Sequence, residues 1–146
     1  MKLPDLSHTP YRSIILSARH EVWCLVSADD YSWLVDNTWN ISWGSRTRWQ
    51  LYAKRNINRE RATLRMHREI MQRAEPLKPK DMAEMYVDHI NGQTLDNRRS
   101  NLRWVTAAEN CANKKRREQI PSLELIVMRI LHDLRKQPAQ LEEVPF

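Results

Sequence analysis

Glycine is scarce in this chain of 146 residues, which contains only Gly44 and Gly92. A loop that cradles the phosphates of a nucleotide needs several glycines within one short segment. The chain has no such segment, so the sequence argues against nucleotide hydrolysis.

Cysteine is equally scarce: Cys24 and Cys111 lie far apart, and there is no Cys-x-x-Cys pair. A structural zinc knuckle is therefore not expected. Two free thiols in a reducing compartment are favoured, although the sequence leaves a single disulfide open.

Long apolar runs are also missing. The opening residues, Met1-Lys2-Leu3-Pro4-Asp5, are not followed by the apolar segment of a signal peptide. No run approaches the roughly 18 apolar residues of a membrane helix. We therefore expect a soluble, cytoplasmic protein with no membrane partner.

Positive charge is what the chain has in excess. It carries 24 Lys and Arg against 18 Asp and Glu, a net charge of +6, and its pI is about 9.6. This balance in a small chain favours an anionic polymer such as nucleic acid as partner. The length suits one domain, or one domain with appendages.

Apolar and β-branched segments in the first half predict a small antiparallel β meander. Residues 1–12 are expected to be an irregular tail, and residues 13–75 a β-rich region that ends in a short helix over 67–73. Residues 76–83 are expected to be a linker, because Pro76 and Pro79 interrupt regular structure.

The second half predicts strand, loop, strand and helix over residues 84–118. Strands are expected at 85–87 and 102–105, and Thr106 and Glu109 form a capping box at a helix start. Residues 119–146 are expected to be a C-terminal helix and tail, since apolar residues recur at helical spacing from Leu123 to Leu134. The fold class is therefore α+β.

Asp88 and His89 stand side by side before an amide-rich loop, and Asn110 lies one turn into the helix that follows. A carboxylate and an amide oxygen are hard ligands for Mg²⁺ or Mn²⁺. A neutral imidazole beside them can take a proton from water. The pattern is what a one-metal phosphodiesterase needs. Alternatives remain open at this point: Asp88 can cap a turn, Asn110 can be an exposed helix residue, and His89 can be a second metal ligand.

The segment resembles the HNH nuclease family, and more closely the phage-type HNH proteins that include homing endonucleases. The resemblance is carried by residues 87–92, 96–98 and 100–106, together with Asn110 and Asn113, and it extends weakly upstream over residues 64–71. It implies a ββα-metal module with one Mg²⁺ or Mn²⁺ per site. It also implies that a backbone carbonyl orients the second ring nitrogen of the base. Asn110 replaces the final histidine of the family name, which makes this an H-N-N variant.

Other polar residues of the segment receive supporting roles. Asn101 is expected to hold the loop beneath the catalytic pair, and Asp96 and Asn97 to form turns. Asn113 is expected either to touch phosphate or the metal shell, or to face solvent. His67 is expected to be buried and hydrogen-bonded.

Basic residues cluster upstream of the motif and around it. Phosphate contacts supply most of the non-specific affinity for DNA, so these residues are candidates for a DNA-positioning surface, with a solvated face as the alternative. The candidates are Arg46, Arg48, Lys54, Arg55, Arg65, Arg98, Arg99, Arg103, Asn113, Lys114 and Lys115.

The sequence as a whole predicts a metal-dependent endonuclease that acts on double-stranded DNA, with His89 as base, Asp88 and Asn110 as metal ligands and Asn101 in support. One site per chain favours nicking by a monomer, while a homodimer through the C-terminal helix is the alternative. The rivals are a DNA-binding protein with a vestigial module, used in regulation or packaging, and an RNA-directed nuclease.

Overall fold

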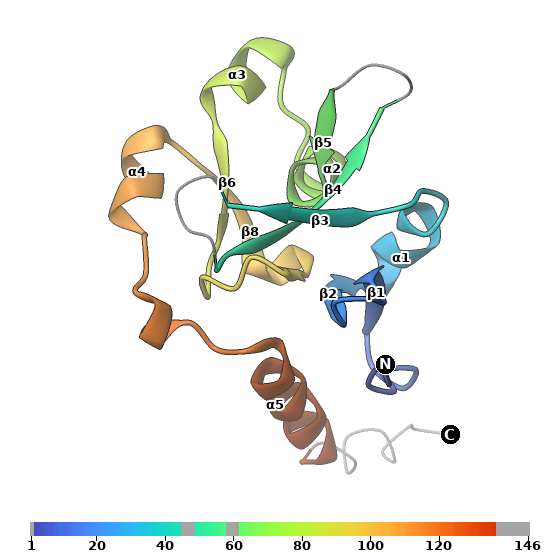
Figure 1. Ribbon diagram of the computed structural model, residues 1–146. Coiled ribbons are helices and arrows are strands. Elements are labelled where there is room, and N and C mark those ends of the chain that lie inside the picture. The colour runs from blue at the N-terminus through green and yellow to red at the C-terminus, as the bar shows by residue number, and fades with distance from the viewer. Residues whose placement is uncertain (1, 45–48, 58–61, 137–146) are drawn as a thin grey trace, which may run out of the picture.

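The computed structural model describes residues 2–44, 49–57 and 62–136, and its elements follow one another as Figure 1 shows. The strands are β1 (Tyr11–Ser17), β2 (Val22–Ser27), β3 (Asn40–Trp43), β4 (Leu51–Asn56), β5 (Thr63–Arg65), β6 (Tyr86–His89), β7 (Asp96–Asn97) and β8 (Leu102–Val105). The α-helices are α1 (Ala28–Leu34), α2 (Met66–Ala74), α3 (Pro79–Glu84), α4 (Ala107–Ala112) and α5 (Leu123–Arg135). Two 3₁₀ helices are η1 (Arg99–Asn101) and η2 (Arg117–Gln119).

The first sheet combines two strands of the N-terminal region with one strand from the 84–118 segment. Strands β1 and β2 form an antiparallel hairpin, and β7 pairs with β2 in parallel through Leu25 opposite Asp96 and Val26 opposite Asn97. The backbone N–H of Leu25 also donates to the carbonyl of Leu95 over 2.9 Å. A strand of the 84–118 segment therefore completes the N-terminal sheet.

The second sheet is the antiparallel meander β3–β4–β5. The β-rich region expected over residues 13–75 thus contributes to two sheets, because helix α1 follows β2 and separates the β1–β2 hairpin from the β3–β4–β5 meander. Helix α2 begins at Met66, directly after β5, and four of its residues are buried (Met66, His67, Ile70 and Met71).

The segment expected to be a linker contains helix α3. Pro79 stands at the start of that helix, where a proline is tolerated because the first amides of a helix have no intrahelical partner. The expectation that two prolines keep residues 76–83 irregular is therefore wrong for its second half. Irregular backbone does cover residues 2–10, as expected for the tail, yet Leu6 is buried there and packs in the core.

The third sheet is the antiparallel pair β6–β8, followed by α4. The capping box is present: the Glu109 amide donates to the Thr106 hydroxyl, and the Thr106 amide donates to the Glu109 carboxylate. Helix α4 therefore starts where the sequence predicts.

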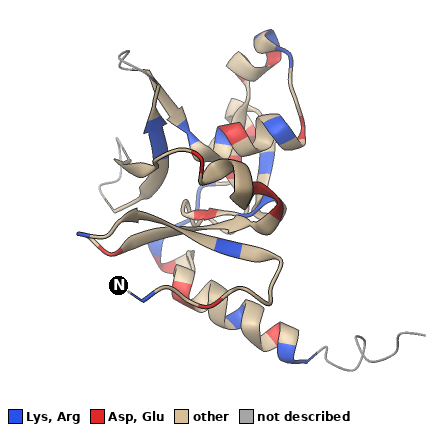
Figure 2. Cartoon of the chain, turned by 90° about the vertical axis from the view of Figure 1, so that its right-hand side faces the viewer, with Lys and Arg blue, Asp and Glu red and all other residues tan. Residues whose placement is uncertain are grey.

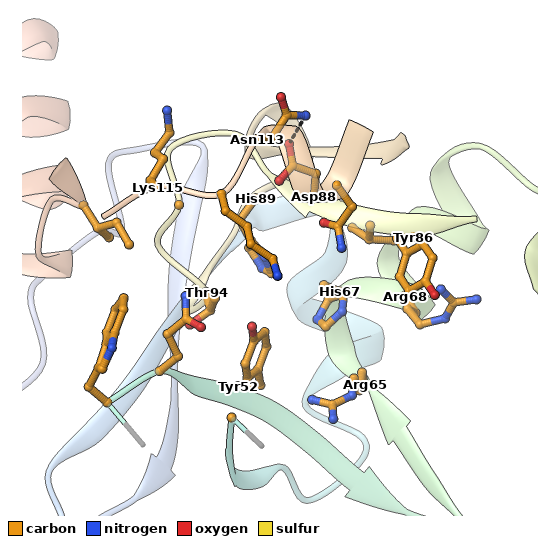
Figure 3. A pocket seen from close by; sticks show the side chains of 18 residues that line it. Tyr52, Arg65, His67, Arg68, Tyr86, Asp88, His89, Thr94, Asn113 and Lys115 are labelled. Atoms are coloured by element: carbon orange, nitrogen blue, oxygen red, sulfur yellow. Dashed lines mark hydrogen bonds between the residues drawn. The ribbon is translucent and has the colours of Figure 1, made fainter. Parts of the chain in front are cut away.

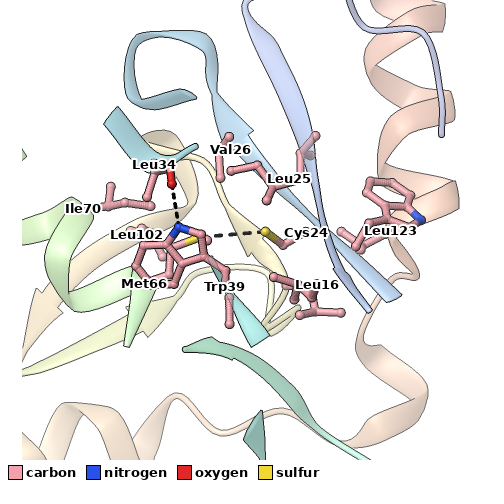
Figure 4. Close-up of a cluster of buried hydrophobic side chains, with 14 of the residues drawn as sticks. Leu16, Cys24, Leu25, Val26, Leu34, Trp39, Met66, Ile70, Leu102 and Leu123 are labelled. Atoms are coloured by element: carbon pink, nitrogen blue, oxygen red, sulfur yellow. Dashed lines mark hydrogen bonds between the residues drawn. The ribbon is translucent and has the colours of Figure 1, made fainter. Parts of the chain in front are cut away.

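One apolar cluster connects these elements (Figure 4). It includes Cys24 and Leu25 of β2, Met66 of α2 and Leu102 of β8. The C-terminal helix joins the same cluster through the buried residues Leu123, Ile126 and Val127. The N-terminal part of the apolar stripe of α5 is thus covered by its own chain, whereas Leu134 is exposed.

The fold class is α+β, with an N-terminal β region, a ββα module and a C-terminal amphipathic helix. Both cysteines are free thiols, as expected, with Cys24 buried and Cys111 exposed. Basic and acidic residues are interspersed along the helices (Figure 2). Within the described part of the chain, no helix is long and apolar enough to cross a membrane.

Candidate active site

The strand pair β6–β8 places Asp88 and His89 on opposite faces. Asp88 lies opposite Arg103 and His89 opposite Leu102 in the register of the pair. Because successive side chains of a strand point to opposite faces, Asp88 stays partly exposed while His89 is buried. Both side chains nevertheless line the same cavity, since that cavity opens around the end of β6.

The His89 ring is oriented by an amide. Its Nε2 lies 2.8 Å from Oδ1 of Asn97, which is fully buried. A carboxamide oxygen only accepts, so Nε2 carries the proton and the lone pair of the neutral ring is on Nδ1. The expected backbone carbonyl is thus wrong, because the turn residue Asn97 folds inward and supplies its side chain instead.

The loop between β6 and β8 is held from inside by its own polar residues. Nδ2 of Asn101 donates to the carbonyl of Asp96 over 2.9 Å, and its Oδ1 accepts from the amide of Asn91 over 3.0 Å. Asp96 is fully buried and forms an ion pair with Arg98 at 2.8 Å. This network fixes the segment that carries Asn97, and hence the position of the His89 ring.

A second imidazole lies beside the first. The ring centroids of His67 and His89 are 5.1 Å apart in an edge-to-face arrangement, and the Tyr52 ring lies 5.8 Å from His67. His67 is buried as expected, but no described residue forms a hydrogen bond with its Nδ1, so the expectation of a hydrogen-bonded histidine is wrong for that atom. Burial is the main cause that lowers the pKa of His67 well below its usual value, and the neighbouring His89 lowers it further.

Burial also lowers the pKa of His89, while the bond to Asn97 and the charges of Asp96 and Asp88 act in the opposite direction. The net shift keeps the His89 ring neutral near pH 7, which is the state that can accept a proton.

Asp88 is held by one of its two oxygens. Oδ2 accepts from Nε and Nη2 of Arg103 at 3.0 and 2.9 Å, and from Nδ2 of Asn113 at 3.4 Å. Among the described residues, none donates a hydrogen bond to Oδ1. Asn110 lies on α4, half-buried, and lines the same cavity as Asp88.

The cavity has a volume of about 510 Å³ and is built from segments far apart in sequence (Figure 3). Asp88 and Asn113 lie on one side of it, and Tyr52 and Arg65 on the other, with His67 between. Lys114 and Lys115, just after α4, stand at its border. The cavity therefore combines a carboxylate, a base and several cations.

The donor set fits a hard divalent cation. Asp88 offers a carboxylate oxygen without a donor partner and Asn110 an amide oxygen at the same cavity, and such oxygens suit Mg²⁺ or Mn²⁺. In the described part of the chain, no group of three or more His, Cys, Asp or Glu side chains could hold a metal. The cation would therefore keep water and substrate oxygens as its remaining ligands, as Mg²⁺ commonly does.

The candidate phosphate-binding residues divide into two sets. Arg55, Arg98, Arg99 and Arg103 form ion pairs with Glu69, Asp96, Asp30 and Asp88. Arg65, Lys114 and Lys115 are exposed, line the cavity and form no ion pair with a described acid. Lys54 is half-buried on β4, and Arg46 and Arg48 lie outside the described residues.

Residues 66–112 match the family model described as HNH endonuclease. This segment belongs to the HNH endonuclease family. The match includes Asp88, His89, Asn97, Asn101 and Asn110, while residues 1–65 and 113–146 lie outside it. No curated protein and no solved structure matches the chain.

The sequence pattern assigned no catalytic or positioning role to two residues of the candidate site. The sequence predicts Asn97 to form a turn, and Tyr52 belongs to no motif, whereas Arg68 stands in the upstream stretch 64–71 that carries the weaker resemblance. Arg68 ties α2 to the end of α3 by donating to the carbonyls of Met82 and Met85. Asn97 stands within residues 96–98, which carry part of the HNH resemblance, and this position could have indicated a role in the site. Nothing in the sequence around Tyr52 on β4 indicates that it lies at the site.

Proposed function

We propose that this chain is a divalent-metal-dependent endonuclease that hydrolyses phosphodiester bonds of double-stranded DNA, one strand per encounter. The observation that carries the proposal is the 2.8 Å contact between Nε2 of His89 and Oδ1 of Asn97. A carboxamide oxygen only accepts, so Nε2 carries the proton and the basic Nδ1 belongs to a residue that shares a cavity with Asp88 and Asn110. The family match adds nuclease activity on DNA as the expected chemistry.

In the proposed reaction, Nδ1 of His89 removes a proton from a water molecule. The water oxygen attacks phosphorus, and the bond from phosphorus to the leaving deoxyribose oxygen breaks. That oxygen takes a proton from solvent, and His89 returns its proton to solvent. A Mg²⁺ or Mn²⁺ ion held by Asp88 and Asn110 would supply positive charge against the developing negative charge.

The exposed basic side chains that line the cavity position the substrate by binding its phosphates. Arg65 lies on one side of the cavity, and Lys114 and Lys115 lie at the end of α4. Cations on two sides of the catalytic pair can bind successive phosphates of one strand. We leave Arg98 and Arg99 out of this surface, because their guanidinium groups are engaged with buried carboxylates.

The test is a supercoiled-plasmid assay in Mg²⁺ or Mn²⁺, with and without chelator, that separates nicked from linear product. We expect nicked product that chelator abolishes. His89→Ala should reduce the single-turnover rate about 10²–10⁴-fold at matched DNA occupancy. His20→Ala is the matched control, because His20 is exposed in the β1–β2 turn.

Equal cleavage by the wild type and His89→Ala would overturn the assignment of the base. DNA binding without any cleavage would favour the non-catalytic DNA-binding protein. Faster cleavage of a matched RNA would favour the RNA-directed nuclease.

A further inference from the structure

Arg103 holds Asp88 in a way that differs from the other ion pairs. In the pairs Arg98–Asp96 and Arg99–Asp30, Nε and Nη2 bind different oxygens of the carboxylate. The pair Arg55–Glu69 has the same two-oxygen arrangement. In Arg103–Asp88 both nitrogens bind Oδ2 alone.

The one-oxygen arrangement follows from the strand register. Arg103 and Asp88 are directly opposite each other in the β6–β8 pair, so the guanidinium reaches the carboxylate from the side. Asn113 donates to the same Oδ2 from the end of α4. Three donors from two elements therefore fix the carboxylate by one oxygen and leave the other for a different ligand.

We propose that Arg103 is a positioning residue for metal binding: it presents Oδ1 of Asp88 to the cation, and its charge weakens cation binding to the free protein. This inference rests on the proposed role of Asp88 as a ligand. The two effects have opposite consequences. The clamp orders the ligand oxygen for catalysis, while a positive charge next to the carboxylate opposes a second positive charge there.

The consequence is that cation and DNA bind cooperatively. DNA phosphates bring negative charge that offsets Arg103, and they add oxygen ligands that the protein does not provide. A free protein that binds the cation weakly then becomes loaded at the substrate, which is reciprocal coupling between two ligands.

The experiment compares the Mn²⁺ affinity of the wild-type full chain with that of its variants, in the absence of DNA. Bound Mn²⁺ is measured from the loss of the EPR signal of the free ion. Arg103→Gln should bind Mn²⁺ about 30-fold more tightly than the wild type, the effect of one unit charge on a doubly charged ion about 4 Å away in water. At saturating Mn²⁺ the same variant should cleave plasmid at least about 10-fold more slowly, because the clamp on Asp88 is lost. Arg129→Gln, an exposed position on α5 with the same change in net charge, should alter neither quantity.

Tighter binding combined with slower cleavage is a result that simple loss of structure does not produce. Unchanged or weaker Mn²⁺ binding by Arg103→Gln would overturn the proposal. If that variant does not fold, Arg103→Lys decides the question. Lysine keeps the positive charge, but its single side-chain nitrogen cannot reproduce the two hydrogen bonds that Nε and Nη2 of Arg103 donate to Asp88. The Arg103→Lys variant should retain wild-type Mn²⁺ affinity and lose cleavage rate, and a tighter affinity would overturn the proposal.

Asp88→Asn separates this inference from the proposed function. If Asp88→Asn binds Mn²⁺ as well as the wild type does, Asp88 is not a ligand, and both the ligand assignment and the Arg103 inference fall. If Asp88→Asn loses Mn²⁺ binding and Arg103→Gln matches the wild type, the ligand assignment stands and the role of Arg103 is overturned.

Discussion

Nε2 of His89 and Oδ1 of Asn97 lie 2.8 Å apart, and both side chains are buried. Nδ2 of Asn97 lies 3.3 Å from the sulfur of Met66, so the amide is placed with its oxygen toward the imidazole. The tautomer of the proposed base is therefore set by a residue that need not touch the substrate.

Asn97→Ala should lower the single-turnover cleavage rate roughly 10- to 100-fold, the usual effect of removing a partner that orients a functional side chain. Asn97→Asp keeps an acceptor opposite Nε2 and should recover part of that rate. Thermal unfolding of each variant checks that the fold persists. The control is Asn37→Ala, an exposed amide after α1. An Asn97→Ala rate equal to that of the wild type would remove this residue from the site.

Asp88→Ala should lose Mn²⁺ affinity and activity, and Asn110→Ala should weaken both less, because only the aspartate carries charge. Calorimetric titration with uncleavable DNA present measures the affinity. Asn113→Ala is the matched amide variant; it loses one long bond of 3.4 Å to Asp88 and should change affinity least. If Asn110→Ala kept both the wild-type affinity and rate, Asn110 would not be a ligand.

Stability should fall on acidification because of the two buried imidazoles. The pKa values of His67 and His89 are lowered in the folded state, chiefly by burial. The unfolded chain therefore binds more protons as pH falls through about 6.5, and stability that is complete above that pH is progressively lost below it. For His67, whose pKa is lowered well below its usual value, the loss approaches about 1.4 kcal/mol per pH unit.

Urea unfolding between pH 8 and 5 measures this dependence, in chelator so that no metal contributes. His67→Asn should flatten the slope, whereas His20→Asn, at an exposed turn, should leave it unchanged. A His67→Asn variant with the wild-type slope would show that His67 does not produce the effect.

Helix α5 should tolerate charge on one face only. Ile126 is 5% exposed in the core, whereas Met128 on the same helix is 66% exposed. Ile126→Glu should destabilise the fold by roughly 3 kcal/mol or more, and Met128→Glu should leave it folded. Sedimentation velocity on both variants distinguishes this from dimerisation. A dimeric wild type converted by Ile126→Glu into a folded monomer would identify α5 as an interface.

Local pattern was enough to predict the parts of this protein that short segments determine. The adjacent Asp88 and His89 and the later Asn110 stand within one stretch, and the HNH resemblance covers that stretch. The capping box of Thr106 and Glu109 acts within a single turn, so α4 begins where it was expected. The amphipathic period of α5 depends only on its own residues.

Neither the split of the β region nor helix α3 could be predicted in the same way. Short apolar segments predict strands but not their partners, and β2 pairs with β7 about seventy residues later in the chain, as Leu25 opposite Asp96 shows. A proline disrupts the interior of a helix but is favoured at its first position. The sequence around Pro79 does not show which of these applies, whereas the structure places it at the start of α3.

The sequence alone reveals a carboxylate, an imidazole and an amide in an order that resembles an HNH module. How those groups are held depends on the tertiary structure. Asn97 turns inward to His89, Arg103 takes one oxygen of Asp88, and Tyr52 and His67 arrive at the cavity from the second sheet and α2. Residue types are fixed locally, whereas these contacts depend on strand register and on packing around a shared core.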